Sequence, residues 1–91
     1  MVSLEVAALP EGGGFVAKVS NSTNVSALYV KPMLLDAEGK QLAYVAFDSA
    51  FVTIRPGEPA QFGLVEKGSE KPAVMFCAEA WNAPRACTST R

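Results

Sequence analysis

Residues 21–58 read NSTNVSALYVKPMLLDAEGKQLAYVAFDSAFVTIRPGE, and this stretch decides the fold. It opens on a polar turn, continues as an apolar run as far as Leu35, and turns again at Gly39 before two further apolar runs. It ends on Pro56, Gly57 and Glu58, a tight corner in which a glycine is free to take a positive φ. The pattern predicts a strand, a hairpin, a strand, a corner and a strand.

Similar short apolar runs, with turn residues between them, recur along the whole chain. We predict strands at 3–9, 15–20, 27–35, 41–47, 51–54, 61–65 and 73–80. The first two alternate apolar and polar side chains, as strands with one buried face do. Glycines 12–14 are predicted as a turn, because the Lys and Ser or Thr of a phosphate-binding loop do not follow them, and 67–71 as a polar loop.

No segment keeps apolar residues at helical spacing for more than about two turns. At 91 residues the chain is large enough for one core and too short for two domains. We therefore predict that residues 1–91 form a single immunoglobulin-like antiparallel β-sandwich of about seven strands.

The predicted strand at 27–35 contains a proline. Because Pro32 cannot donate a hydrogen bond to a neighbouring strand, we expect a bulge, an unpaired edge position or a split near 31–33.

The same strand is apolar on both faces, which a strand of a solitary sandwich does not require. Its outward side chains, joined by Met75 and Cys77 if the strand at 73–80 is a neighbour, would form an apolar patch. We interpret this patch as a candidate docking surface, and the alternative is that loops cover it. Its residues are Tyr29, Met33, Leu35 and Met75.

The charges exclude several partners. Eight basic and nine acidic residues give a net charge of −1 and are scattered singly, so we expect no nucleic acid and no anionic membrane as partner. No apolar run reaches the roughly 20 residues of a membrane helix, and the first residues do not resemble a signal peptide. The compartment stays open, with an extracellular or periplasmic location favoured.

The two cysteines are Cys77 and Cys87. They could close a short disulfide loop, which would fit an oxidising compartment. A single pair at unremarkable spacing is weak evidence for a bond, so two free thiols are the favoured interpretation, and the choice stays open.

Catalytic and metal chemistry lack their usual residues. The chain contains no histidine, and two cysteines alone do not supply the four ligands of a structural zinc site. Asp36 and Glu38 are candidate calcium ligands, but a solvated hairpin turn explains them better. We therefore predict no catalytic residues, no metal and no cofactor, and expect that the chain is not itself an enzyme.

A set of turn-forming and core-forming residues carries a family resemblance. They are Val19, Ser20, Asn21, Ser22, Thr23, Ala27, Leu28, Tyr29, Val30, Lys31, Leu34, Leu35, Asp36, Gly39, Phe51, Thr53, Pro56, Gly57, Glu58, Trp81 and Asn82. Together they resemble the C-terminal immunoglobulin-like domain of glycoside hydrolase family 2 enzymes, most closely the exo-β-glucosaminidases and β-mannosidases. The chain departs from the family pattern where Ser49 and Ala50 replace an Asp and Asn pair, and where Ala80 replaces a glycine.

The resemblance implies a non-catalytic accessory domain that packs against the catalytic (β/α)8 barrel of the same polypeptide. Two alternatives stay open. One is a carbohydrate-binding module that uses Trp81 as its sugar platform, although core or interdomain packing is the favoured interpretation of that side chain. The other is an immunoglobulin-like surface or adhesion module.

Overall fold

The structure, a computed structural model, describes residues 2–11, 14–43, 45–68 and 73–90. Over these residues the chain forms strands and no helix, so none that could cross a membrane. The eight strands are β1 (Leu4–Glu11), β2 (Gly14–Asn21), β3 (Ala27–Leu35), β4 (Val45–Phe47), β5 (Val52–Ile54), β6 (Pro59–Lys67), β7 (Met75–Ala80) and β8 (Ala83–Ser89).

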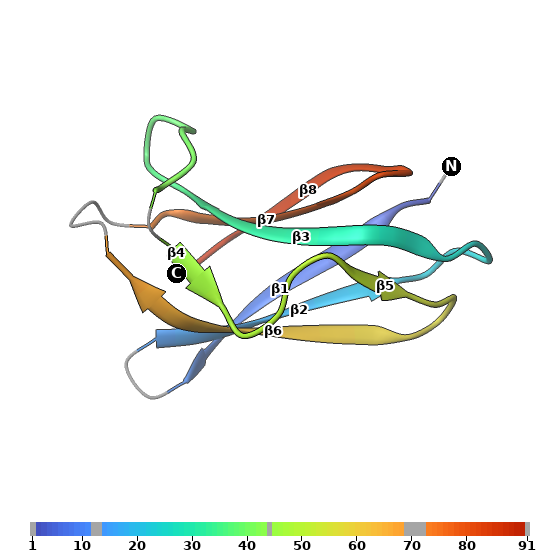
Figure 1. Ribbon diagram of the computed structural model, residues 1–91. Helices are drawn as coiled ribbons and strands as arrows, with labels where there is room; N and C mark the ends of the chain where they lie inside the picture. Colours follow the sequence, from blue (N-terminus) through green and yellow to red (C-terminus); the bar gives the residue numbers. More distant parts are fainter. Residues whose placement is uncertain (1, 12–13, 44, 69–72, 91) are drawn as a thin grey trace.

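Two antiparallel sheets of four strands face each other, in the orders β1-β2-β6-β4 and β5-β3-β7-β8 (Figure 1). In the first sheet β1, β2 and β6 correspond to strands A, B and E of an immunoglobulin domain. In the second sheet β3, β7 and β8 correspond to strands C, F and G. The predicted immunoglobulin-like β-sandwich is therefore confirmed, with eight strands in place of seven. Residues 12–13 of the predicted turn and 69–71 of the predicted loop lie outside the described residues, whereas Gly14 belongs to β2 and Lys67 to β6.

The core lies between the sheets. β1 and β2 pair along their full length, from Leu4 opposite Asn21 to Glu11 opposite Gly14. Their inward residues Leu4, Ala17 and Val19 are buried, which confirms the predicted alternation. They pack in one cluster with residues of the other strands, among them Val30, Leu34, Ile54, Phe62 and Phe76.

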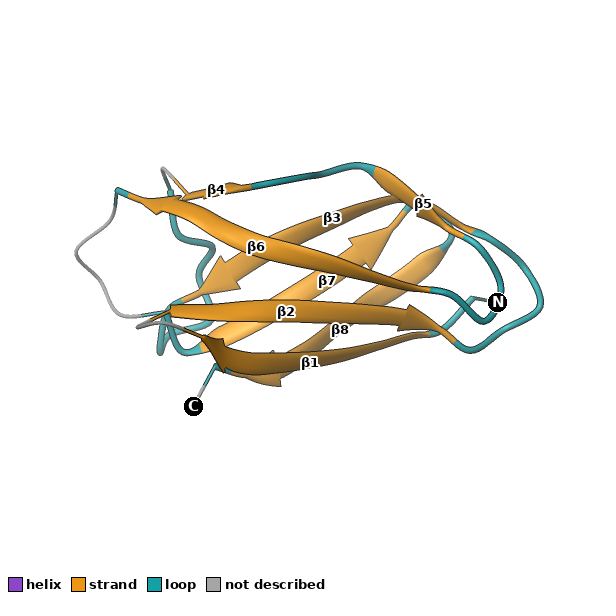
Figure 2. Cartoon of the chain, turned by 90° about the horizontal axis from the view of Figure 1, so that it is seen from below, coloured by secondary structure: helices purple, strands orange, loops and turns teal. Residues whose placement is uncertain are grey.

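β4 and β5 run along one long edge of the sandwich and belong to different sheets (Figure 2). β4 pairs with β6 and β5 pairs with β3, so the chain passes from one sheet to the other between Phe47 and Val52. At the crossing the Asp48 amide donates to the Gly63 carbonyl, and the Gly63 amide donates to the Asp48 carboxylate, each over 2.9 Å. Asp48 thereby pairs with backbone groups of β6 that an open sheet edge would leave without a partner.

Asn21 is the most deeply buried polar residue among those that the structure describes in the stretch 21–58. Its side-chain amide donates to the carbonyls of Val25 and Ile54 over 2.7 and 3.0 Å, and its carbonyl oxygen accepts from Thr23. The backbone amide of Gly57 donates to the backbone carbonyl of Asn21 over 2.8 Å. The two turns that the sequence predicts, at 21–24 and 55–59, therefore meet at Asn21.

Pro32 does not interrupt β3. It faces Ala78 in an unbroken register with β7, and the pairing of β3 with β5 ends earlier, at Val30. Among the three expected outcomes, Pro32 therefore takes the unpaired edge position. The irregularity of the strand lies instead between Ala27 and Val30, before the proline.

β8 was not predicted, and it overturns the preference for free thiols. The strand pairs with β7, which places Cys87 directly opposite Cys77, and the two form a disulfide. Its sequence, APRACTS, contains none of the large aliphatic or aromatic residues that mark strands. Unless a strand is predicted there, nothing in the sequence pattern places the two cysteines side by side.

Candidate functional site: an aromatic groove

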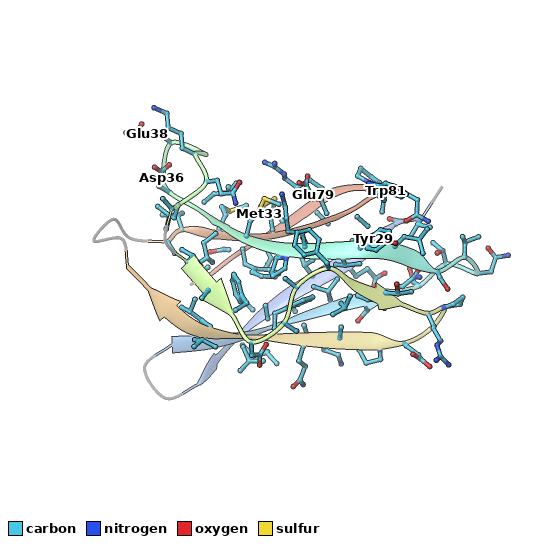
Figure 3. The ribbon with its side chains drawn as sticks, in the orientation of Figure 1. Tyr29, Met33, Asp36, Glu38, Glu79 and Trp81 are labelled. Atoms are coloured by element: carbon cyan, nitrogen blue, oxygen red, sulfur yellow. A yellow bond between two sulfur atoms is a disulfide. The ribbon has the colours of Figure 1, made fainter. Side chains whose placement is uncertain are left out.

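Three aromatic side chains are exposed at one end of the outer face of the β5-β3-β7-β8 sheet. Tyr29, Phe51 and Trp81 expose 53%, 63% and 82% of their surface. They border an open groove of about 400 Å³, which we call the aromatic groove. Its lining residues are Tyr29, Lys31, Phe51, Glu79, Ala80 and Trp81. Figure 3 shows Tyr29, Glu79 and Trp81 together on the side of this sheet that faces away from β1, β2 and β6.

Two of these aromatic residues have an unusual backbone conformation. Tyr29 and Phe51 both have φ of 55°, in the left-handed region that bulky residues rarely enter. Tyr29 lies in the irregularity between Ala27 and Val30, where two residues of β3 oppose the single Thr53 of β5. Each such residue costs about 1–2 kcal/mol, so the fold keeps both aromatic positions at an energetic expense.

The turn between β7 and β8 is fixed to this bulge. The Leu28 amide donates to Oδ1 of Asn82 over 2.9 Å, and Nδ2 of Asn82 donates to the Ser26 carbonyl over 2.8 Å. The backbone amide of Trp81 also donates to the Leu28 carbonyl over 2.9 Å. These three bonds join residues more than 50 positions apart and hold the two aromatic residues Tyr29 and Trp81 as neighbours.

The rings of Tyr29 and Trp81 contact each other at right angles. Their centroids lie 5.3 Å apart with an interplanar angle of 80°, an edge-to-face arrangement that aromatic pairs favour. The two rings therefore form a corner of aromatic surface, with Phe51 of the crossing segment beside it in the groove lining.

Charged side chains continue the outer face next to the groove. Lys31 and Glu79 are partners on β3 and β7, with Nζ 3.4 Å from Oε1. The Nε atom of Arg85 on β8 lies 3.4 Å from the other oxygen, Oε2. One carboxylate is thus held between two cations, all three partly exposed.

The candidate docking residues are distributed differently from the predicted continuous patch. Met33 and Leu35 are 2% and 7% exposed and pack with the buried Cys77 in a small outer cluster, to which the half-buried Met75 is added. Their strands are neighbours, as the prediction required. Of the four candidate docking residues, Tyr29 alone is exposed.

Trp81 lies outside the core of this domain, with four fifths of its surface exposed. Sequence reasoning missed Phe51, Lys31, Glu79 and Asn82 as members of one site. A signal existed for Asn82, which directly follows Trp81 and is one of the residues that carry the family resemblance. No signal joined the other three, because their proximity depends on the pairing of β3 with β5 and β7.

The turn that follows β3 is organised by the side chain of Asp36. Oδ1 of Asp36 accepts the amides of Glu38 and Lys40 over 2.9 and 3.0 Å, the pattern of an Asx turn. Among the described residues, no three His, Cys, Asp or Glu side chains gather where they could hold a metal ion.

Comparison with protein-family models, with curated proteins and with solved structures gave no match for this chain. Function is therefore inferred from the aromatic groove and from the sequence resemblance.

Proposed function

We propose that this chain is a non-catalytic accessory module of a larger polysaccharide- or oligosaccharide-degrading glycoside hydrolase, and that it binds carbohydrate in the aromatic groove. The observation that carries the proposal is the exposure of Tyr29, Phe51 and Trp81 around one open groove beside a Lys31–Glu79 pair. The resemblance to family 2 accessory domains supplies the glycoside hydrolase setting.

The chemistry of a sugar ring fits this combination. One face of a pyranose presents C–H groups, which pack on the electron-rich face of an aromatic ring and leave water when they do so. The hydroxyl groups at its rim require hydrogen-bond partners, and Lys31 and Glu79 offer donors and acceptors at the side of the groove. Pockets that combine an apolar lining with few polar groups are typical of small-ligand sites.

Rigidity also favours binding. The bonds of Asn82 fix the bulge and the Trp81 turn before any ligand arrives, so less conformational entropy is lost on binding. Tyr29 and Phe51, the two residues with strained backbone, both line the groove. Such strain often accompanies functional sites, where the surrounding structure maintains it.

The groove does not offer the groups that would cleave a glycoside. Hydrolysis generally uses two carboxylates on either side of the scissile bond. Among the described residues that line the groove, Glu79 is the one carboxylate, and it is paired with Lys31. We therefore assign binding to the groove and chemistry to the rest of the parent enzyme.

Calorimetric titration of the chain with neutral manno- and cello-oligosaccharides tests the proposal. Removing the indole with Trp81→Ala should weaken binding at least about tenfold, which corresponds to ~1.4 kcal/mol. Val65→Ala is the matched control, because Val65 is 67% exposed on β6 of the other sheet. Equal affinities for the original chain and Trp81→Ala, or no binding of any sugar at millimolar concentration, would refute it.

Docking on the catalytic barrel is the second candidate function, and the same exposed rings favour it. Three large apolar side chains that lie together are suitable for a partner domain as well as for a sugar. Cleaving the linker of the parent enzyme and measuring whether the module stays attached distinguishes the two. Release by Tyr29→Ser and Trp81→Ser, in a module that binds no sugar, would establish docking instead.

A further inference from the structure

We infer that the aromatic groove prefers acidic sugars, such as uronic acids, over neutral sugars and discriminates against amino sugars. This inference rests on the proposed carbohydrate binding and specifies the class of sugar. It comes from the net charge of Lys31, Glu79 and Arg85, whereas sugar binding as such rests on the exposed rings and on the hydrogen-bonding groups beside them.

The carboxylate beside the groove is already occupied by cations. Its Oε1 is paired with Lys31 and its Oε2 with Arg85, each over 3.4 Å. An ammonium group of an amino sugar that approaches Glu79 would meet the positive charge of both Lys31 and Arg85. Lys31, Glu79 and Arg85 form an ionic row of two cations and one carboxylate, which has a net charge of +1.

The cations keep unused donors. A lysine ammonium has three N–H groups and a guanidinium has five, so one contact to Glu79 leaves most of them available. Lys31 lines the groove, and its side chain is 38% exposed. A carboxylate on a sugar in the groove could therefore pair with Lys31 without breaking the contact to Glu79.

Spacing along the strands places these donors within reach. Lys31 lies two residues after Tyr29 on β3, and Glu79 lies two residues before Trp81 at the end of β7. Lys31 and Glu79 face each other across the two strands, and all four residues line the same groove. A sugar ring stacked on Tyr29 and Trp81 would therefore have its substituents beside Lys31 and Glu79.

Three oligosaccharides of equal length test the inference by calorimetry: an oligouronate, a neutral cello-oligosaccharide and a chitosan oligosaccharide. Since exposed ion pairs contribute modestly, the oligouronate should bind roughly two- to fivefold more tightly than the neutral sugar at low salt. The chitosan oligosaccharide should bind most weakly. Salt at about 0.5 M should remove the acidic preference, because it screens exposed charges.

Lys31→Gln should equalise the acidic and neutral affinities while leaving neutral binding in place. Lys18→Gln is the control, since Lys18 is an exposed lysine on β2 of the other sheet. Binding of the neutral sugar with no acidic preference, or tightest binding of chitosan, would overturn the inference and leave the proposed function standing. No binding of any of the three would overturn both.

Discussion

Asn82 is the residue on which the aromatic groove most depends, and Asn82→Ala removes both of its side-chain hydrogen bonds. Each such bond contributes about 0.5–1.5 kcal/mol net, and the Leu28 amide and Ser26 carbonyl that lose their partner can in part bond to water. We therefore expect a loss of about 1–2 kcal/mol in the free energy of unfolding. For a domain of this size that lowers Tm by roughly 5–15 °C.

Sugar affinity should fall together with stability, because the bulge that carries Tyr29 and the turn that carries Trp81 keep only the Trp81–Leu28 backbone bond of the three that join them. Asn82→Asp should recover at most part of the loss, since a carboxylate still accepts from the Leu28 amide but places an acceptor where Nδ2 donated to the Ser26 carbonyl. Urea denaturation followed by circular dichroism measures stability, and calorimetry measures binding. Asn24→Ala, at an exposed turn position, is the control. Unchanged stability and affinity in Asn82→Ala would refute this account of the site.

Three further predictions concern stability. The free energy of unfolding should be about 0.5–1 kcal/mol higher for Phe51→Gly than for Phe51→Ala. The reason is that relief of the left-handed backbone strain exceeds the entropic cost of glycine. Equal stabilities of the two variants would exclude strain at this position. Paired Cys77→Ala and Cys87→Ala substitutions should cost about 2–3 kcal/mol, given a sequence separation of 10, and thermal unfolding with and without reductant measures this. Asn21→Ala should lower the free energy of unfolding by about 2–4 kcal/mol, because it leaves the carbonyls of Val25 and Ile54 without their donor. A loss under 1 kcal/mol in urea denaturation would contradict the role of Asn21 in joining the two turns.

The sandwich was predictable because burial on one face imposes a period of two. In β2, Ala17 and Val19 point inward and Lys18 outward, and a one-residue shift would reverse all three. β8 was not predictable on that basis, since its side chains are small or polar and none belongs to the fully buried core. The disulfide depended on β8 and was missed with it.

The site was harder to predict because its members meet only through strand pairing. The outward faces of Met33 and Leu35 read as exposed apolar positions, but the neighbouring Cys77 and Met75 pack against them. Phe51 reaches the groove because the chain crosses between sheets just before β5. Neither pairing nor crossing leaves a periodic signal in the sequence.

The indole N–H signal of Trp81 in a two-dimensional NMR spectrum tests the central claim most directly. The chain contains a single tryptophan, so this signal is assigned without mutagenesis. If the aromatic groove binds carbohydrate, the signal should move progressively and saturably as oligosaccharide is added. A signal that stays in place at millimolar oligouronate, neutral sugar and chitosan oligosaccharide alike would contradict the claim.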